Sequence, residues 1–256
     1  MASAPVDSTV RAKSVTFNEK DSDMKKIIEG AIGATVLLST MLLAPSEIRA
    51  QAQQQPQQPM SFFVTSVGPG NGGNLGGLAG ADKHCQTLAA AAGAGNRTWR
   101  AYLSLAPAGN QAPVNARGRI GAGPWYNAKG QLIAANVGEL HGDADVERDR
   151  NNIRKPSSLN EKGEEVKGVG DTPNTHDMLT GSDSLGRIAV GAANVLTCNN
   201  WTSNSDADRA IVGHHDRLGG GNTSWNAAHS TAGCSQPAIV KTGGAGLFYC
   251  FALPAN

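Results

Sequence analysis

The sequence predicts an α+β fold with short strands, long loops and covalent cross-links between cysteines. The segments rich in β-forming residues are short, and only one segment has clear helical character. The chain carries 32 glycines while aromatic residues make up 5%, a composition typical of a loop-rich protein. All four cysteines lie downstream of a predicted export signal, and an even number in that position indicates a disulfide framework. They are Cys85, Cys198, Cys234 and Cys250.

The first 60 residues are predicted to lie outside the folded domain. A basic start at 24–26, an apolar stretch over 30–44 and small residues at 50 and 52 predict a signal peptide over residues 24–52. The alternative is an uncleaved single-pass anchor, for which 18 residues from Ile27 that include Glu29 are marginal. We interpret residues 1–23 as a non-native or disordered extension. Residues 53–60 read as a Gln/Pro-rich linker, and residues 61–256 as one domain.

The charge pattern excludes two classes of partner. The formal net charge is +1, so there is no basic excess for binding nucleic acid. The sequence also lacks a basic amphipathic helix for a membrane surface, so we expect membrane contact only through an uncleaved signal anchor. We therefore expect a secreted, periplasmic or extracellular protein.

In the N-terminal half, β-formers predict a strand over 61–66. Continuous apolar and alanine positions predict a helix over 78–92, with Asp82 in its first turn and glycines at 93 and 95 ending it. A second strand is expected over 97–104 and a short helix or turn over 114–120. A hairpin is expected over 125–133, with its tip at 127–130.

The C-terminal half begins after a polar region, 138–176, which we interpret as a long loop of the kind that is often functional. Strands are expected at 199–203, 210–213, 238–240 and 246–252, and the stretch 218–226 reads as a loop.

Four cysteines allow three pairings, and the sequence alone does not choose among them. We prefer the nested pairing, in which Cys198 joins Cys234 and Cys85 joins Cys250, so that the second bond would tie the predicted helix to the final strand. A Cys₄ zinc site is the competing interpretation, but the sequence has no Cys-x₂-Cys pair.

An ordered set of short motifs resembles a known family. The motifs are Phe63–Ser66, Gly73–Asp82, Cys85, Arg100–Ser104, Gly181–Arg187, Cys198–Ser203 and the ending from Cys234 to Cys250. Together they are similar to bacterial secreted proteins of the C-type-lectin-like superfamily, close in layout to the endostatin module of collagens. The resemblance spans about residues 61–252, and its specificity lies in the order of the motifs.

The resemblance implies a compact C-type-lectin-like (endostatin-like) domain, with small antiparallel sheets, one or two helices and long loops. It also implies the nested disulfides and a function in binding. The calcium site of the sugar-binding branch does not carry over, because Gln236-Pro237-Ala238 lacks the third oxygen ligand. The N-terminal histidine zinc cluster of endostatin is absent from the sequence too, so no cofactor is expected.

The densest ionisable cluster is His214-His215-Asp216. It is interpreted either as a metal or ligand contact, or as a hydrogen-bonded structural turn, and we favour the turn. The loop His141-Gly-Asp143-Ala-Asp145-Val-Glu147 offers alternating oxygen ligands but does not match an EF-hand, and a solvated loop is preferred. Of the four tryptophans, Trp125 and Trp225 are expected to be the most exposed.

We therefore expect a non-catalytic binding module that recognises a glycan, an envelope polymer or an extracellular protein through its long loops. The predicted contact surface lies between the inner cysteines and comprises His214, His215, Asp216, Asn222, Trp225 and Asn226. Two other classes remain open: a secreted metal-dependent hydrolase using His214, His215 and the acidic 141–147 loop, and a purely structural envelope protein.

Overall fold

The computed structural model describes residues 57–142, 150–190 and 195–254. The predicted extension and signal peptide, and the first part of the predicted linker, lie outside these residues. Within them, no helix has the length and apolar character needed to cross a membrane.

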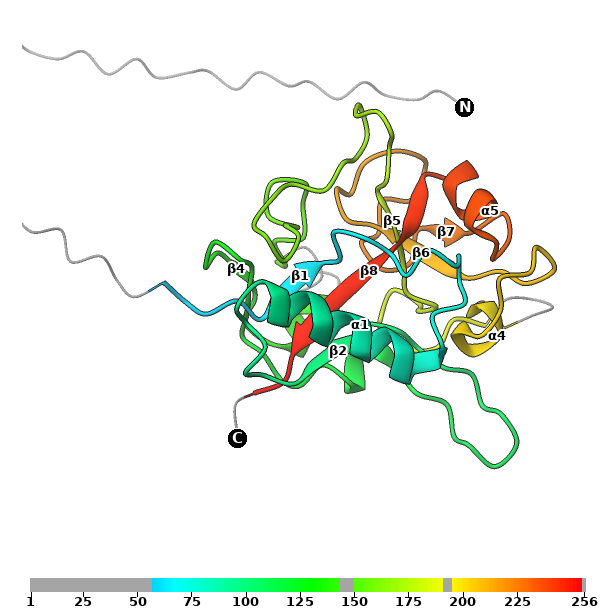
Figure 1. Ribbon diagram of the computed structural model, residues 1–256, viewed down its shortest axis with the longest axis horizontal. Helices are drawn as coiled ribbons and strands as arrows, with labels where there is room; N and C mark the ends of the chain where they lie inside the picture. The colour runs from blue at the N-terminus through cyan, green and yellow to red at the C-terminus, as the bar shows by residue number, and fades with distance from the viewer. Residues whose placement is uncertain (1–56, 143–149, 191–194, 255–256) are drawn as a thin grey trace, which may run out of the picture. The chain divides into compact units, whose positions relative to one another are not determined.

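The architecture is α+β, as predicted, and a mixed six-stranded sheet forms its centre. The strands are β1 (Phe62–Val64), β2 (Trp99–Ala101), β5 (Asp177–Leu179), β6 (Ile211–His214), β7 (His229–Ser230) and β8 (Gly244–Ala252). Their order is β1-β8-β5-β6-β7, with β2 also paired to β8, which runs through the middle of the sheet (Figure 1). The expectation of purely antiparallel sheets is wrong for one pair, because β5 and β8 run parallel.

Both faces of the sheet are covered around β1, β5 and β8, whose residues are almost all buried, while β7 at the edge is half-buried. Along β8, residues 248, 250 and 252 belong to one core cluster and residues 247, 249 and 251 to the other. This division follows from the period of two that places successive side chains on opposite faces of a strand. The same alternation divides β1, where Phe63 faces the first cluster and Phe62 and Val64 the second.

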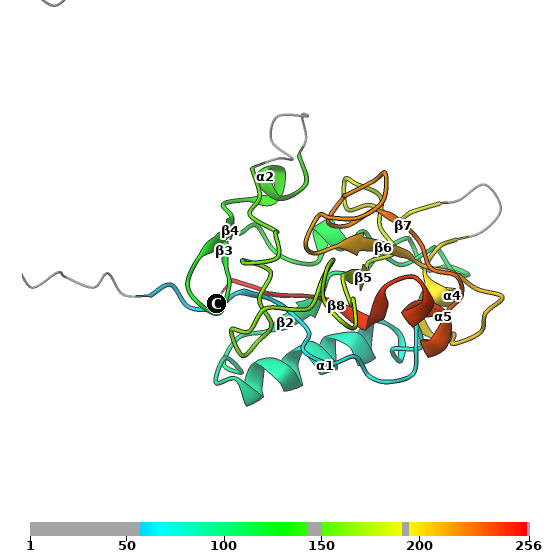
Figure 2. The same ribbon diagram turned by 90° about the horizontal axis from the view of Figure 1, so that it is seen from above.

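Helix α1 (Gly77–Ala91) covers the first face through buried Ala81, Cys85 and Ala89, which are spaced four residues apart. The small hairpin of β3 (Trp125–Tyr126) and β4 (Leu132–Ala134), together with α2 (Val137–His141), covers the second face. Figure 2 shows α1 and α2 on opposite sides of β8. A 3-10 turn, η1 (Ala116–Gly118), lies where a short helix or turn is predicted.

An ion cluster joins α1 to the neighbouring chain. Asp82 accepts hydrogen bonds from Arg100 at 2.7 Å, from Arg119 at 2.7 and 3.0 Å, and from the Ala101 N–H at 2.9 Å. The side chains of Asp82 and Arg119 are only 12% and 11% exposed. Removing the carboxylate would therefore leave a buried cation without its counter-ion.

The nested disulfides are confirmed. Cys85 on α1 is bonded to Cys250 on β8, across 165 positions of sequence. Cys198 is bonded to Cys234, across 36 positions. The outer bond thus ties the N-terminal helix to the central strand, and the inner bond closes the region that carries β6 and β7.

The strands predicted at 61–66, 97–104, 210–213 and 246–252, the hairpin and the helix at 78–92 are confirmed, although several strands are shorter than predicted. The predicted loop 138–176 contains part of α2 at its start and β5 follows it.

The strand predicted at 199–203 is wrong. Residues 198–201, labelled α4 (Cys198–Trp201), form a left-handed turn with φ values of 48°, 50°, 56° and 65°. Such a run is costly for residues other than glycine, so tertiary contacts must hold it. The Trp201 indole donates to the Ser104 carbonyl at 2.8 Å, and the inner disulfide holds Cys198.

The strand predicted at 238–240 is wrong as well, because this segment is part of helix α5 (Gln236–Lys241). Ser235 is its N-cap and accepts a hydrogen bond from the Ala238 N–H, while Pro237 occupies the first turn. These are helix-start signals, and they outweigh the β-propensity of Ile239 and Val240.

Candidate functional site

The pairing of β5, β6 and β7 brings ionisable side chains from distant parts of the sequence onto one face of the sheet. Asp177, the first residue of β5, pairs directly with His214, the last residue of β6. His229 opens β7 and pairs with Val212, two residues before His214. Because cross-strand partners share a face, Asp177, His214 and His229 project to the same side, and His176 precedes them on the chain.

The Asp177 carboxylate lies at the centre of these residues. Its Oδ1 is 3.3 Å from Nε2 of His176, 3.4 Å from Nε2 of His214 and 3.5 Å from Nε2 of His229. The side chain of Asp177 is 0% exposed, and that of His214 is 2% exposed. His229 is the outermost member at 39%. His176, Asp177 and His214 each place a potential ligand atom within 4.8 Å of the others.

Two of the three histidines have their other ring nitrogen committed to an acceptor. Nδ1 of His176 lies 3.1 Å from Oδ1 of Asp216, and Nδ1 of His229 lies 3.1 Å from the Ser230 carbonyl. A carboxylate and a carbonyl only accept, so both Nδ1 atoms carry the proton. In the neutral form of each ring, Nε2 therefore presents a lone pair toward Asp177.

The centre of the cluster is poorly satisfied by hydrogen bonds. Among the described residues, neither carboxylate oxygen of Asp177 and neither ring nitrogen of His214 has a hydrogen-bond partner. The contacts of 3.3–3.5 Å exceed the usual N–H···O range of about 2.7–3.2 Å. Buried polar groups are normally satisfied, so such a concentration of unsatisfied atoms calls for an explanation.

The electrostatics favour an ionised carboxylate. Burial alone would raise the pKa of Asp177, but His214, His229 and His176 outweigh it and hold this pKa below its ordinary value. Burial alone would also raise the pKa of Asp216. Hydrogen bonds from His176, from the Val169 N–H and from the Leu218 N–H outweigh this effect and lower that pKa. The contact with Asp177 in turn raises the pKa of His229.

Of the six residues predicted as a contact surface, two belong to this cluster: His214 directly and Asp216 through His176. The ring of His215 points elsewhere, because its Nε2 lies 3.2 Å from the Lys167 carbonyl. Burial lowers the pKa of that imidazole.

The remaining predicted residues are placed differently. Trp225 and Asn226 are each 1% exposed, and only Asn222 is exposed to solvent. The expectation that Trp125 and Trp225 are exposed is wrong, because both pack in the second core cluster. Five of the six residues, with Asn222 the exception, are thus buried in the described structure.

The acidic loop proposed for a hydrolase cannot be placed beside the histidines. Asp143, Asp145 and Glu147 lie outside the described residues. His141 is buried, and its Nε2 lies 2.8 Å from the Tyr102 hydroxyl, within the second core cluster.

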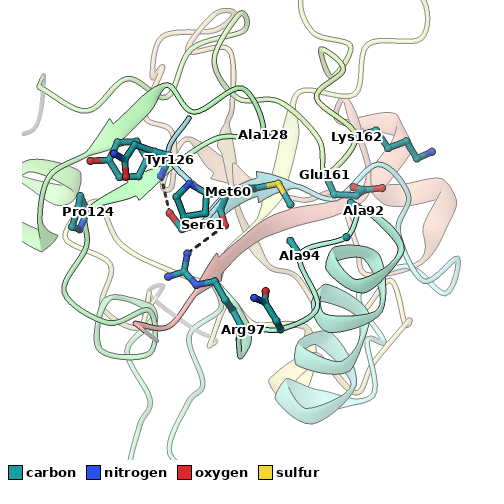
Figure 3. A pocket seen from close by; sticks show the side chains of 14 residues that line it. Met60, Ser61, Ala92, Ala94, Arg97, Pro124, Tyr126, Ala128, Glu161 and Lys162 are labelled. Atoms are coloured by element: carbon teal, nitrogen blue, oxygen red, sulfur yellow. Dashed lines mark hydrogen bonds between the residues drawn. The ribbon is translucent and has the colours of Figure 1, made fainter. Parts of the chain in front are cut away.

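A groove with a volume of about 1000 Å³ lies elsewhere on the domain. Its walls come from the start of the described chain, the turn after α1, the β3–β4 hairpin and residues 161–162. Figure 3 shows Pro124 and Tyr126 toward one end of the groove, Lys162 toward the other, and Met60 and Arg97 between them.

The polar groups of the groove differ in how far they are already engaged. The Arg97 guanidinium donates to the carbonyls of Met60 at 3.3 Å and Leu253 at 2.9 Å. Both oxygens of Glu161 accept from Ser66, one from its N–H and the other from its hydroxyl. Asn96 and Lys162 are exposed to solvent, and Tyr126 is half-buried.

The sequence predicted only part of the cluster formed by the histidines and aspartates around Asp177. His214 and Asp216 were identified, but His176, Asp177 and His229 were missed. The available signal was a His-Asp pair directly before the apolar Met178-Leu179, at a strand start that pairs with the strand ending in His214. No protein-family model and no curated protein matches this chain, so geometry alone carries the functional argument.

Proposed function

We propose that the protein is an exported, non-catalytic binding module of the C-type-lectin-like (endostatin-like) class, and that it binds a glycan or a carbohydrate polymer of the cell envelope. The class proposal is supported by the nested disulfides, one joining the N-terminal helix to the last strand and the other lying inside it. Export to an oxidising compartment, periplasmic or extracellular, is supported by the same two bonds, since disulfides persist mainly there.

The observation that carries the binding proposal is the groove of about 1000 Å³. A sugar presents apolar C–H faces and hydroxyl groups together, so a site for it needs an aromatic ring beside amide and charged donors. Tyr126 supplies such a ring, while Asn96 and Lys162 supply accessible polar groups on other walls. Sites for small ligands are concave and combine an apolar lining with a few polar groups, as this groove does.

The groove is a different site from the contact surface predicted between Cys198 and Cys234, and none of its lining residues comes from that segment. Trp225 and Asn226 would have to leave a packed core to touch a polymer, whereas Tyr126 and Lys162 are accessible as they stand. Fewer rearrangements on binding mean a smaller loss of affinity.

The test is a binding assay with defined glycans and with isolated envelope polysaccharide, using the disulfide-intact protein. We expect saturable binding that weakens about tenfold or more on Tyr126→Ala, as for an aromatic anchor residue. Lys162→Ala should weaken it less. Asn222→Ala is the matched control, because Asn222 is exposed on the alternative surface and should leave binding unchanged.

Two outcomes would count against this proposal. Loss of binding on Asn222→Ala, with Tyr126→Ala unaffected, would return the site to the loops between Cys198 and Cys234. An absence of saturable binding to any carbohydrate, with capture of an envelope protein instead, would replace the ligand class.

A further inference from the structure

We propose that His176, Asp177, His214 and His229 form a binding site for one transition-metal ion, with zinc as the best match. The inference is independent of glycan binding, because the four residues lie at the junction of β5, β6 and β7 and none of them lines the groove.

The first argument is electrostatic. Nδ1 of His176 and Nδ1 of His229 each face an oxygen acceptor, so Nε2 of each ring is left to face the Asp177 carboxylate. One divalent cation among the four groups would give the three Nε2 atoms and the carboxylate a common positive charge to face.

The second argument is dimensional. Zinc binds histidine nitrogen and carboxylate oxygen at about 2.0–2.1 Å, so adjacent ligand atoms of a tetrahedron are about 3.3–3.4 Å apart. The three measured separations from Asp177 Oδ1 to the histidine Nε2 atoms are 3.3, 3.4 and 3.5 Å. These separations are too long for good hydrogen bonds and match the three tetrahedron edges that meet at the carboxylate oxygen. The ligand atoms of His176, Asp177 and His214 all lie within 4.8 Å of one another, and His229 reaches this group through its 3.5 Å contact with Asp177.

The third argument is the set of atoms that surrounds the site. Asp216 accepts from Nδ1 of His176, which forms the carboxylate–histidine arrangement that orients metal ligands. The Ser230 carbonyl does the same for His229. Both Asp177 oxygens and both His214 nitrogens otherwise have no partner among the described residues. A metal ion would use the atoms that the fold leaves unsatisfied.

The donor set also selects the ion. Three imidazole nitrogens and one carboxylate oxygen suit zinc, and to a lesser degree copper, nickel or cobalt. Calcium and magnesium prefer six or more oxygen ligands, which these residues do not supply. Four protein ligands leave no coordination position for a substrate, so the site is structural: it would fasten β7 and the preceding loop to β5 and β6.

The experiment uses the full, disulfide-intact protein, whose metal content is measured before and after dialysis against a chelator. Zn²⁺ is then titrated in competition with a chromogenic chelator. We expect one equivalent of Zn²⁺ with a Kd below about 100 nM, unaffected by excess Ca²⁺. Cobalt loading should give the intense visible absorption of a tetrahedral ion.

The variants separate metal binding from folding. Asp177→Asn and His214→Ala should abolish tight binding, but both residues are buried and the variants can fail to fold. His229→Ala alters a partly exposed ligand, so it should fold and bind zinc at least 10-fold more weakly. Asp216→Asn should weaken binding about 10- to 100-fold, through the orientation of His176. His84→Ala, at a histidine on α1, is the matched control and should bind zinc as the unaltered protein does.

The proposal is overturned if the correctly disulfide-bonded protein shows no saturable binding of zinc, copper, nickel or cobalt. It is also overturned if folded His229→Ala binds zinc as tightly as His84→Ala. An octahedral cobalt spectrum would likewise refute the four-residue ligand set.

Discussion

Trp225 is predicted from sequence to contact a ligand at the surface, whereas the structure places it in the core. Its ring centroid lies 4.9 Å from that of Tyr102, 5.3 Å from that of Tyr249 and 5.7 Å from that of His141. Only 1% of the residue is exposed. Trp225→Ala should therefore act on stability before it acts on binding.

The size of the effect follows from these contacts. Truncating a buried tryptophan to alanine costs about 3–5 kcal/mol, because the apolar transfer free energy is lost and a cavity remains. The value should fall near the lower end, because the indole N–H is buried without an acceptor among the described residues and its removal relieves that cost. For a domain of this size, about 3 kcal/mol lowers Tm by roughly 6–12 °C.

The assay is reversible chemical denaturation followed by tryptophan fluorescence, with Tm from calorimetry as a second measurement. Asn222→Ala, three residues away in sequence but exposed, should change the free energy of unfolding by less than about 1 kcal/mol. If Trp225→Ala unfolds cooperatively within 1 kcal/mol of the unaltered protein, Trp225 is not packed in the second core cluster. The surface contact predicted from sequence would then be favoured again.

Three further predictions concern the disulfides, the ion cluster and the buried tyrosines. Replacing Cys198 and Cys234 together by alanine should lower the free energy of unfolding by about 4 kcal/mol, since their bond closes a loop of 36 positions; an unchanged urea midpoint would contradict this. Asp82→Ala should cost about 3–5 kcal/mol because a buried guanidinium loses its counter-ion, and a denaturation curve like that of the unaltered protein would argue against the cluster. Burial raises the pKa of Tyr102 and Tyr249 above its ordinary value near 10, so at most one of the chain's three tyrosines should ionise before unfolding. The unfolded chain releases these protons above about pH 10 and the native chain keeps them, so stability should fall as the pH rises through that range. Tyrosinate absorbance measures how many tyrosines ionise at each pH. Two ionisations in the folded protein would show that Tyr102 and Tyr249 are not both buried.

Local signals predicted much of the fold. The helix over 77–91 follows from its run of alanines and apolar residues, and β8 follows from its dense β-formers. The prediction failed where short-range preference and tertiary contact disagree. Cys198–Trp201 adopts left-handed backbone values that no local propensity favours, because contacts with Ser104 and the inner disulfide impose them.

The candidate metal site was harder to predict, because it depends on strand register. Asp177 and His214 are 37 positions apart in sequence and become direct neighbours only through the β5–β6 pairing. A slip of one residue would place their side chains on opposite faces. His214 and His215 are adjacent in the sequence, but successive side chains of a strand point to opposite faces, so the two rings are separated. The side chains that lie beside His214 come from other segments of the chain.

The position of β8 within the sheet has a consequence for how the molecule is made. This strand pairs with β1, β2 and β5, and it follows all three in the chain. Until it emerges during synthesis, none of those strands has the neighbour that completes its ladder, and Cys85 lacks its bonding partner. The sheet therefore cannot close before the last strand of the domain has been synthesised. Assembly then depends on contacts between distant segments, which are slow to form. The last strand to be made is thus the one that completes the sheet and supplies Cys250 for the outer disulfide.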